Sequence, residues 1–577
     1  MTVIDNNPAG DGGAAGDSPQ FLSTLEKSEA FQLSPGEKKF IGWHIGVAVA
    51  ALAVGSLFGP LQAFQFSGVD FYPYLEPVIK SYYQGLTLHG VLNALVWTTF
   101  FIMGFTNLTT MKGLGRSLSH PKINQAGFAT MVVGLLMAAV PLLLNKATVL
   151  YTFYPPLKAN AFFYLGLALV IIGSWIEGLG FYLTLAAWRK ENPGVRSPFI
   201  ALANIINSAM WQIATLGIAV EVLTMLLPWS LGWIDATDPE LARTYFWFTG
   251  HPLVYFWLLP AYTSWYGMLP KQVGGKLFSD SLARFAFWMF LIVSVPVGFH
   301  HQFTDPGVPQ TWKWIHALLT YSVFFPSTIT LFTVVASLEY GARKRGGTGL
   351  IGWIRALPWN DPSVATQLLA GLLFMFGGIG GLTNASYNIN LVIHNTAWVP
   401  GHFHLTVASA VTMSFMGISF WMVPYLSGRK LWSQKWALIQ TWTWFVGMVI
   451  FSNAMHVVGL LGAPRRTPLG DALYVPEAWN GHLMRVSIGG FILLVSATIY
   501  VFGMAKTMLG PKVDPSELPT MPIADSLRSA QLTPVWLDSF KPWLIGAGLL
   551  LVIAYGPQLV DQILNMNLNA PGFPGAY

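Results

Sequence analysis

The sequence predicts an all-α integral membrane protein with about 13 transmembrane helices. Its 577 residues are 53% hydrophobic and only 10% charged, whereas soluble proteins have about 25% charged residues. Apolar stretches of about 20 residues, the length that crosses a bilayer as a helix, recur along the whole chain. The net charge of +6 is explained by basic loops at the membrane surface, so we expect no nucleic-acid partner.

The apolar stretches follow one another with short loops between them. Residues 1–35 precede the first stretch; they begin Gly-rich and acidic, and we expect a mobile cytoplasmic tail. Residues 36–577 then form a single transmembrane domain, because none of its loops is long enough for another domain. The predicted spans are 41–63, 81–110, 125–145, 160–188, 201–228, 243–269, 282–303, 312–340, 365–385, 398–426, 435–461, 484–508 and 534–556.

The basic residues of the loops set the orientation of the spans. Most Lys and Arg of the loops follow even-numbered spans. Because Lys and Arg concentrate in cytoplasmic loops, the N-terminus is predicted to lie inside and the C-terminus outside. The predicted outer loops hold only Lys80, Lys146, Lys158, Arg465 and Arg466.

Six histidines fall at one depth of the predicted bundle. Ionisable groups are costly inside a bilayer, and those that occur there usually have a function. At a rise of 1.5 Å per residue, all six lie within roughly 15 Å of the outer edge. They come from four helices and are His89, His251, His300, His301, His402 and His404.

Helical geometry assigns His402 and His404 to different metal ions. They point about 200° apart on one helix, because each residue turns the helix by about 100°. His89 and His404 could clamp one haem from both faces. His402 could then bind a second haem whose other face stays open, and an open iron position beside a copper ion can bind and reduce O₂.

The sequence contains no cysteine, so its metal chemistry depends on histidine. This excludes disulfides, iron–sulfur clusters, covalently attached c-type haem and thiolate copper centres. Neutral imidazole suits copper and haem iron. The other three histidines, His251, His300 and His301, make a copper site. The adjacent pair His300 and His301 can converge if the polar end of the helix that carries them frays.

Four motifs resemble those of a known family. They are HGVLNALVW at His89, WFTGHPLVYFWLLP at His251, FHHQFTDPG at His300 and HNTAWVPGHFHL around His402. In their order and spacing they resemble the catalytic subunit of haem–copper oxygen reductases, most closely the B-type branch that includes the ba3 cytochrome c oxidases. The pattern of spans extends this resemblance over nearly the whole chain.

The resemblance implies a role for each of these histidines. It implies a low-spin haem of b type between His89 and His404, a high-spin haem of a or related type on His402, and the copper ion CuB on the other three. It also implies that Tyr255 is covalently joined to His251, four residues earlier on the same helix face. In catalysis Tyr255 would donate an electron and a proton.

A polar stripe on the sixth predicted span indicates a proton path. Tyr262 and Tyr266 lie within about 60° of Tyr255 around the helix axis. Hydroxyl groups of the eighth span lie at comparable depths, and the resemblance matches these positions to the K-type pathway of the B branch. The eighth-span residues are Ser327, Thr330 and Thr333.

Arg465 and Arg466 lie outside, against the general charge pattern, and outward-facing haem propionates would explain them. The resemblance places His394 near the propionates of the high-spin haem, and Tyr151 is a candidate for the same polar shell. Asn390 stands where related proteins carry an acidic residue, so the resemblance does not extend to a proton exit path through a carboxylate there. We assign no proton transfer to the two deep carboxylates, Glu177 and Glu221. The remaining histidines are interpreted as structural, and they are His44, His120, His316, His456 and His482.

The implied enzyme is a terminal respiratory oxidase of the cytochrome c oxidase class. It would reduce O₂ to water with four electrons at a haem iron–CuB centre and couple this reaction to proton translocation. Electrons would come ultimately from cytochrome c or another small redox protein, through a separate subunit II that carries CuA and docks on the outer face. Further expected partners are membrane lipids and a small accessory helical subunit. The expected location is the plasma membrane of a prokaryote.

Two alternatives remain open at this stage. A nitric oxide reductase shares the six-histidine plan but replaces CuB with non-haem iron, a metal that generally needs a carboxylate near the three histidines. A secondary transporter with 13 spans would favour inverted repeats and broken helices, which the sequence does not display.

Overall fold

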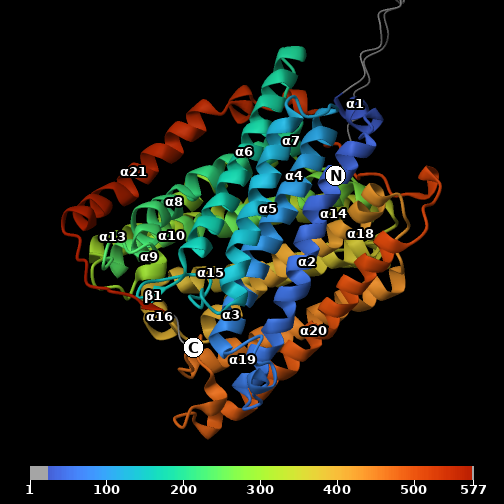
Figure 1. Cartoon of the computed structure of the whole chain (residues 1–577). Coiled ribbons are helices and arrows are strands. Elements are labelled where there is room, and N and C mark those ends of the chain that lie inside the picture. The colour runs from blue at the N-terminus through green and yellow to red at the C-terminus, as the bar shows by residue number, and fades with distance from the viewer. Residues whose placement is uncertain (1–23, 575–577) are drawn as a thin grey trace, which may run out of the picture.

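Long helices packed side by side make up the computed structural model, which describes residues 24–574 (Figure 1). Twelve helices of this part are long and apolar enough to cross a membrane. The only strands found there are β1 (Leu157–Lys158) and β2 (Phe573–Pro574), which pair in parallel. The predicted all-helical membrane fold is therefore confirmed.

Each predicted span corresponds to one rod of the bundle, and several rods consist of consecutive helical segments. In chain order the rods are α2 (Pro35–Phe66); α3 (Tyr82–Gly90), η2 (Val91–Trp97) and α4 (Thr98–Leu114); α5 (Pro121–Leu143); α6 (Ala161–Glu191); α7 (Phe199–Ala214), α8 (Leu216–Glu221), η3 (Val222–Leu226) and α9 (Leu227–Ser230); α10 (Pro239–Gly267); α12 (Asp280–Ser294) and η4 (Val295–Gln302); α13 (Gln310–Ser322) and α14 (Phe324–Lys344); α15 (Pro362–Ala385); α17 (Trp398–Phe403), η6 (His404–Val411) and α18 (Thr412–Ser427); α19 (Gln434–Leu460); η8 (Glu477–Trp479) and α20 (Asn480–Leu509); and α21 (Lys541–Leu564).

Helix α10 is the predicted span that is missing from the twelve apolar helices. It is 29 residues long, and nearly all of its residues from Leu241 to Gly267 are buried. A helix enclosed by other helices does not face lipid, so it tolerates the Trp, Tyr and Thr residues that lower the hydropathy of α10. Its enclosure places it in the interior of the bundle.

Short helical segments lie between or beyond the rods. Thr24–Ala30 form α1, where Ser28 donates a hydrogen bond to the carbonyl of Lys112, and Lys112 Nζ donates to the carbonyl of Phe31 at 2.7 Å. An ordered helix therefore occupies part of the expected tail over residues 1–35, and residues 1–23 lie outside the described part. The other short segments are η1 (Tyr72–Tyr74), α11 (Leu269–Gln272), η5 (Gly352–Ala356), α16 (Tyr387–Ile393), η7 (Leu469–Asp471), η9 (Pro515–Glu517), η10 (Ala530–Leu532) and η11 (Val535–Asp538).

Polar caps start several of the long helices. Ser34 and Glu37 form a capping box at the start of α2, because each side chain accepts a hydrogen bond from the backbone of the other residue. Asp238 caps α10 and Ser279 caps α12 in the same way, with side-chain oxygens that accept from backbone amides of the first turn. These caps satisfy amides that have no partner within the helix.

Helices α5 and α6 approach each other along glycines. A Cβ atom at Gly134 would lie 2.6 Å from the carbonyl oxygen of Gly166, and one at Gly166 would lie 2.5 Å from that of Gly134. Seven residues along each helix, Gly127 and Gly173 repeat this contact. Small residues that let two backbones touch are the usual contact between membrane helices.

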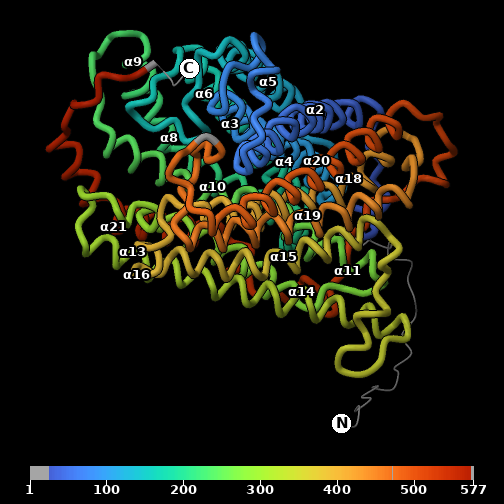
Figure 2. Tube along the Cα trace, turned by 90° about the horizontal axis from the view of Figure 1, so that it is seen from below, coloured from blue at the N-terminus to red at the C-terminus, as the bar shows by residue number. Residues whose placement is uncertain are grey.

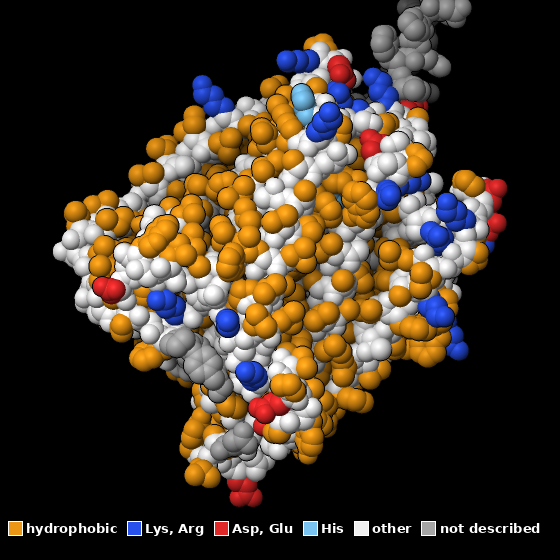
Figure 3. All heavy atoms as spheres, viewed as in Figure 1, with side chains coloured by type: hydrophobic (Ala, Val, Ile, Leu, Met, Phe, Trp, Pro, Cys, Tyr) orange, Lys and Arg blue, Asp and Glu red, His pale blue; other side chains and the backbone are white. Residues whose placement is uncertain are grey.

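The outer surface matches a membrane environment. Hydrophobic side chains cover the broad middle of the face in Figure 3, whereas Lys, Arg, Asp and Glu side chains lie toward its ends and edges. Helix α21 runs along the periphery beside α13 in both views (Figures 1 and 2).

Three rods contain π-helical turns, namely η2, η3 and η6. The turn η2 begins two residues after His89, and η6 begins at His404. Such turns often occur at functional sites, because they change the direction in which neighbouring side chains point.

Candidate functional site

One cavity of about 1020 Å³ lies inside the bundle, and all six predicted histidines line it. Ligand cavities usually measure about 300–1,000 Å³, so this one can hold more than one ordinary ligand. Most of the other predicted site residues also line it, namely Tyr255, Tyr262, Ser327, Thr330, Tyr151, Asn390, His394, Arg465 and Arg466. Tyr266 and Thr333 do not.

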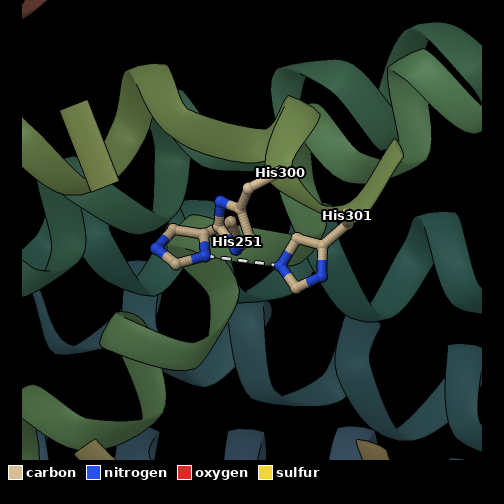
Figure 4. Close-up of side chains that lie close together, drawn as sticks. All are labelled: His251, His300 and His301. Atoms are coloured by element: carbon tan, nitrogen blue, oxygen red, sulfur yellow. Dashed lines mark hydrogen bonds between the residues drawn. The ribbon is translucent and has the colours of Figure 1, made fainter. Parts of the chain in front are cut away.

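His251, His300 and His301 converge in a cluster that could hold a metal ion (Figure 4). One ring nitrogen from each lies within 4.8 Å of the other two, and His251 Nδ1 lies 3.4 Å from His301 Nε2. Within residues 24–574, no Asp or Glu belongs to this group. Three neutral imidazoles are a ligand set that suits copper.

The adjacent histidines converge because their helix changes form before it reaches them. Helix α12 ends at Ser294, and the 3₁₀ segment η4 follows, in which Pro296 has the non-helical angles φ −89° and ψ 41°. Within η4 the ring centroids of His300 and His301 lie 4.0 Å apart. The two histidines therefore lie in a defined turn, where a frayed helix end is expected from the sequence.

Neighbouring side chains orient these rings. His300 Nδ1 lies 2.5 Å from the carbonyl oxygen of Val297 and 3.0 Å from Thr320 Oγ1. Trp247 stacks on His301 with centroids 3.8 Å apart and an angle of 11°. With Nδ1 of His300 engaged, its Nε2 is the nitrogen available to a metal ion, and Nε2 of His301 is the atom near His251. Sequence reasoning missed Thr320 and Trp247, although Trp247 stands one helical turn before His251.

His89 and His404 face each other across the cavity. Their rings are nearly parallel, at 11°, and the centroids lie 6.3 Å apart. Each Nδ1 donates to a backbone carbonyl, that of Gly55 at 3.0 Å and that of Pro400 at 2.6 Å, so each Nε2 remains available as a ligand. Two imidazoles that each bind one ion at about 2 Å would have centroids roughly 6 Å apart, so the pair fits a single metal ion.

His402 lies in a glycine-lined part of the cavity. A Cβ atom at Gly380 would lie 2.7 Å from His402 Nδ1, and Gly377 and Gly381 also line the cavity. His402 Nδ1 is buried against these glycines. The ring of Trp398, one helical turn earlier, stacks on His402 with centroids 5.8 Å apart and an angle of 19°.

Tyr255 lies beside His251. The two ring centroids are 5.0 Å apart, one helical turn along α10. His251 Nε2 is buried and has no hydrogen-bond partner in the described part of the chain. The geometry brings together the two residues for which a covalent link is predicted.

The remaining tyrosines of the stripe continue along α10. Tyr262 and Tyr266 are buried, and Tyr266 donates to Thr330 Oγ1 on α14 at 2.8 Å. Ser327 donates to its own helix, at the carbonyl of Val323. The buried hydroxyl of Thr333 has no hydrogen-bond partner in the described part of the protein. The stripe thus contains one direct bond between helices.

Arg465 and Arg466 bring positive charge to the cavity outside the spans. Burial and the neighbouring Arg466 lower the pKa of Arg465 to about 10. Arg466 lies over the ring of Tyr151 at 5.1 Å, and its buried Nη2 atom has no hydrogen-bond partner among residues 24–574. Burial raises the pKa of Tyr151, but Arg466 and Arg465 outweigh burial and lower it overall. The two guanidinium groups therefore fit an anionic ligand.

His394 and Asn390 form the other side of this polar region. His394 Nδ1 donates to Asn390 Oδ1 at 3.2 Å, and Asn390 Nδ2 donates to the carbonyl of Asn384 at 2.7 Å. Burial and then the charge of Arg465 lower the pKa of His394 to about 4. Because an imidazole with this pKa is neutral near pH 7, the positive charge here comes from the arginines.

The two deep carboxylates have different surroundings. Glu177 pairs with His44 at 2.8 Å and accepts from Asn107 Nδ2 at 2.6 Å, in a buried cluster away from the cavity lining. Glu221 stands immediately before η3, and neither of its buried oxygens has a hydrogen-bond partner in residues 24–574.

Most of the chain is similar to proteins of one known family. Residues 39–492 match the family described as "Cytochrome C and Quinol oxidase polypeptide I". A cytochrome c oxidase subunit 1 of Thermus thermophilus is 43% identical over 559 residues, which cover 94% of this chain and 98% of that protein. A cytochrome c oxidase polypeptide 1 of Halobacterium salinarum is 26% identical over 76% of this chain and 73% of that protein. A solved structure of a heme-copper terminal oxidase dimer aligns with a TM-score of 0.87 and 40% identity over 94% of each chain.

Proposed function

The chain belongs to the cytochrome c and quinol oxidase polypeptide I family, and we propose that its six clustered histidines hold two haems and one copper ion for O₂ reduction. It functions as a terminal oxidase, in line with its similarity to a cytochrome c oxidase subunit 1 and to a heme-copper terminal oxidase. The family implies haems and copper, and the ligand assignments below are our proposal.

The histidines divide into a pair, a single residue and a trio. His89 and His404 hold a low-spin haem of b type, because their Nε2 atoms are free and their ring spacing fits one ion. His402 holds a high-spin haem of a or related type in the glycine-lined part of the cavity. The copper ion CuB lies among the remaining trio, His251, His300 and His301.

When bound, the haems and the copper ion would store electrons and bind O₂. The chain's own contribution begins with Tyr255, which donates an electron and a proton to the reaction. We propose a bond between the Tyr255 ring and His251 Nε2, the free buried nitrogen beside it. Forming this bond removes one hydrogen from each ring, and the O₂ that the enzyme consumes is the oxidant.

Protons reach the cavity along the tyrosine stripe of α10. The bond from Tyr266 to Thr330 connects α10 with α14, and Thr330 and Tyr262 line the cavity that contains Tyr255. Ser327 lines the same cavity and Thr333 lies beyond it. Waters between these hydroxyls would complete the path, since side chains alone do not form an unbroken chain of hydrogen bonds.

The polar region at the end of the cavity receives haem propionates. Arg465 and Arg466 supply the positive charge, and the free Arg466 Nη2 supplies a donor. Tyr151, His394 and Asn390 form the neighbouring shell. Bidentate pairing of guanidinium with carboxylate makes this a strong and directional contact.

The oxidase needs partners because this chain cannot hold every redox centre. A CuA centre uses cysteine ligands and the chain has none, so a subunit II supplies CuA at the outer face. Cytochrome c or another small redox protein delivers the electrons to it. Membrane lipids surround the bundle, a small accessory helical subunit completes it, and the location is the plasma membrane of a prokaryote.

The convergence of the His251, His300 and His301 nitrogens within 4.8 Å carries this proposal. Elemental analysis and a pyridine haemochrome spectrum of the purified protein test it. We expect two haem irons and one copper ion bound to this chain. Copper replaced by a third iron would favour nitric oxide reduction instead, and protein without a Soret band would refute the oxidase assignment.

A further inference from the structure

The turn that carries His300 and His301 is held by two side chains from other helices. The backbone amide of Gly298 donates to Tyr555 Oη at 2.7 Å, and the amide of Phe299 donates to His316 Nδ1 at 3.2 Å. These are the two amides immediately before the histidines. Tyr555 is on α21 and His316 on α13, and both are fully buried.

The two side chains form one unit. His316 Nε2 donates to the carbonyl of Ala554, next to Tyr555, at 3.0 Å. The ring of Phe299 packs on both, with centroids 4.3 Å from that of His316 and 5.0 Å from that of Tyr555. The His316 and Tyr555 rings meet edge to face at 4.9 Å. A movement of either ring would therefore be passed to the turn.

Such acceptors are needed because the turn has left α-helical geometry. In a continuous α-helix the amides of Gly298 and Phe299 would donate to carbonyls four residues earlier. Pro296 breaks that pattern, and a buried amide without a partner is costly. The acceptors on Tyr555 and His316 thus favour the opened turn over a regular helix, in which the adjacent histidines would diverge.

Helix α13 also contacts the histidine ring itself. Thr320, one turn after His316, places Oγ1 3.0 Å from His300 Nδ1. The same helix therefore orients both the backbone before His300 and the ring of His300.

We propose that His316 and Tyr555 are positioning residues of the copper site, which act by holding the amides of η4 so that His300 and His301 converge. This inference rests on the proposed function, in which those histidines bind copper. It gives α21, the last rod of the bundle, a role in metal binding although it contributes no ligand.

Tyr555→Phe and His316→Phe test the inference, because each removes the acceptor and keeps a ring. His316→Gln is the conservative variant, since an amide can both accept from Phe299 and donate to Ala554. Tyr500→Phe is the matched control: Tyr500 is as buried as Tyr555, and its hydroxyl donates to Ser419 at 2.9 Å on another side of the bundle. The measurements are the copper affinity of the purified oxidase and the infrared stretch of CO bound to copper.

We expect Tyr555→Phe and His316→Phe to broaden or shift the copper-bound CO band and to weaken copper binding about 10-fold, with both haem spectra unchanged. His316→Gln and Tyr500→Phe should keep the wild-type band. The inference is overturned if the two Phe variants keep the wild-type band and copper affinity, or if Tyr500→Phe changes both equally. Wild-type protein without copper would refute the proposed function rather than this inference.

Discussion

The hydroxyl of Tyr266 on α10 donates a 2.8 Å hydrogen bond to Thr330 Oγ1 on α14. Thr330 donates in turn to the carbonyl of Pro326 at 2.9 Å, so its hydroxyl both receives and passes on a hydrogen bond. Thr330 reaches the cavity that the six histidines line, and Tyr266 does not. This bond is therefore the point at which a proton from the end of α10 would enter the cavity.

Replacing Thr330 by Val should slow turnover at least about 10-fold, because the methyl group cannot accept from Tyr266 or relay a proton. Proton uptake after a single turnover in stopped-flow measurements checks this, with haem content unchanged. Thr498→Val is the control, since Thr498 is exposed and bonds only to its own helix. Wild-type proton uptake in Thr330→Val would exclude this route.

Replacing Tyr255 by Phe should reduce O₂ consumption at least about 100-fold, since the phenol is the proton and electron donor beside the copper site. Copper and haem contents should stay normal. Tyr245→Phe, on the same helix, should keep full activity. Mass spectrometry of the peptide that contains His251 and Tyr255 should find it lighter by two hydrogen atoms, and an unmodified peptide mass would disprove the cross-link.

Removing single histidines should remove single metal centres. His300→Ala should lose copper and retain both haem spectra, whereas His404→Ala should lose the low-spin haem spectrum, because each variant lacks one ligand of only one site. His120→Ala, an exposed histidine at the start of α5, should match the wild type. Loss of the low-spin haem in His300→Ala would contradict the assignment.

Replacing Arg466 by Gln should lower the reduction potential of the nearest haem. A positive charge about 10 Å away, at an effective dielectric constant of about 20, favours the reduced haem by ~2 kcal/mol, which corresponds to roughly 80 mV. Spectroelectrochemical titration measures the shift. Arg485→Gln, an exposed arginine near His482 at the start of α20, is the control, and equal shifts in both variants would argue against propionate contact.

Replacing Glu177 by Ala should destabilise the protein by about 3–5 kcal/mol, because it leaves the buried His44 and Asn107 without their partner. Glu191→Ala on the same helix removes an exposed carboxylate paired with Arg116 and should cost about 0–1 kcal/mol. Thermal unfolding monitored by the haem absorbance compares them. Turnover at permissive temperature should stay normal in both, whereas a specific loss of proton uptake in Glu177→Ala would reveal a role in transport.

Local periodicity predicts the bundle, and it also predicts a common depth for the six histidines, which line one cavity in the structure. Span length follows from bilayer thickness, and the opposite directions of His402 and His404 follow from the helical repeat. The convergence of His300 and His301 needs a break in the helix. The polar residues after them suggest one there, whereas the structure has it before them, at Pro296.

Contacts between distant segments could not be predicted in the same way. Nothing local in the sequence joins His44 and Glu177, which lie 133 positions apart. The same is true of Phe299, His316 and Tyr555, which come from three different rods. Helix α1 is a further case, because its residues are polar and the hydrogen bond from Ser28 to Lys112 on α4 follows no periodic pattern.

The π-helical turn η6 begins at His404. Its geometry depends on the exact number of residues in this stretch of the enzyme. Such a turn corresponds to one residue added to an ordinary helix, and the wider turn absorbs that residue locally, so deleting a residue there would restore regular winding and remove the change of direction that the turn gives to neighbouring side chains. Exchanging one apolar residue for another in this stretch alters only its packing, whereas shortening it would change the directions of His402 and His404. Variation in this part of the gene is therefore expected as substitutions and not as small insertions or deletions.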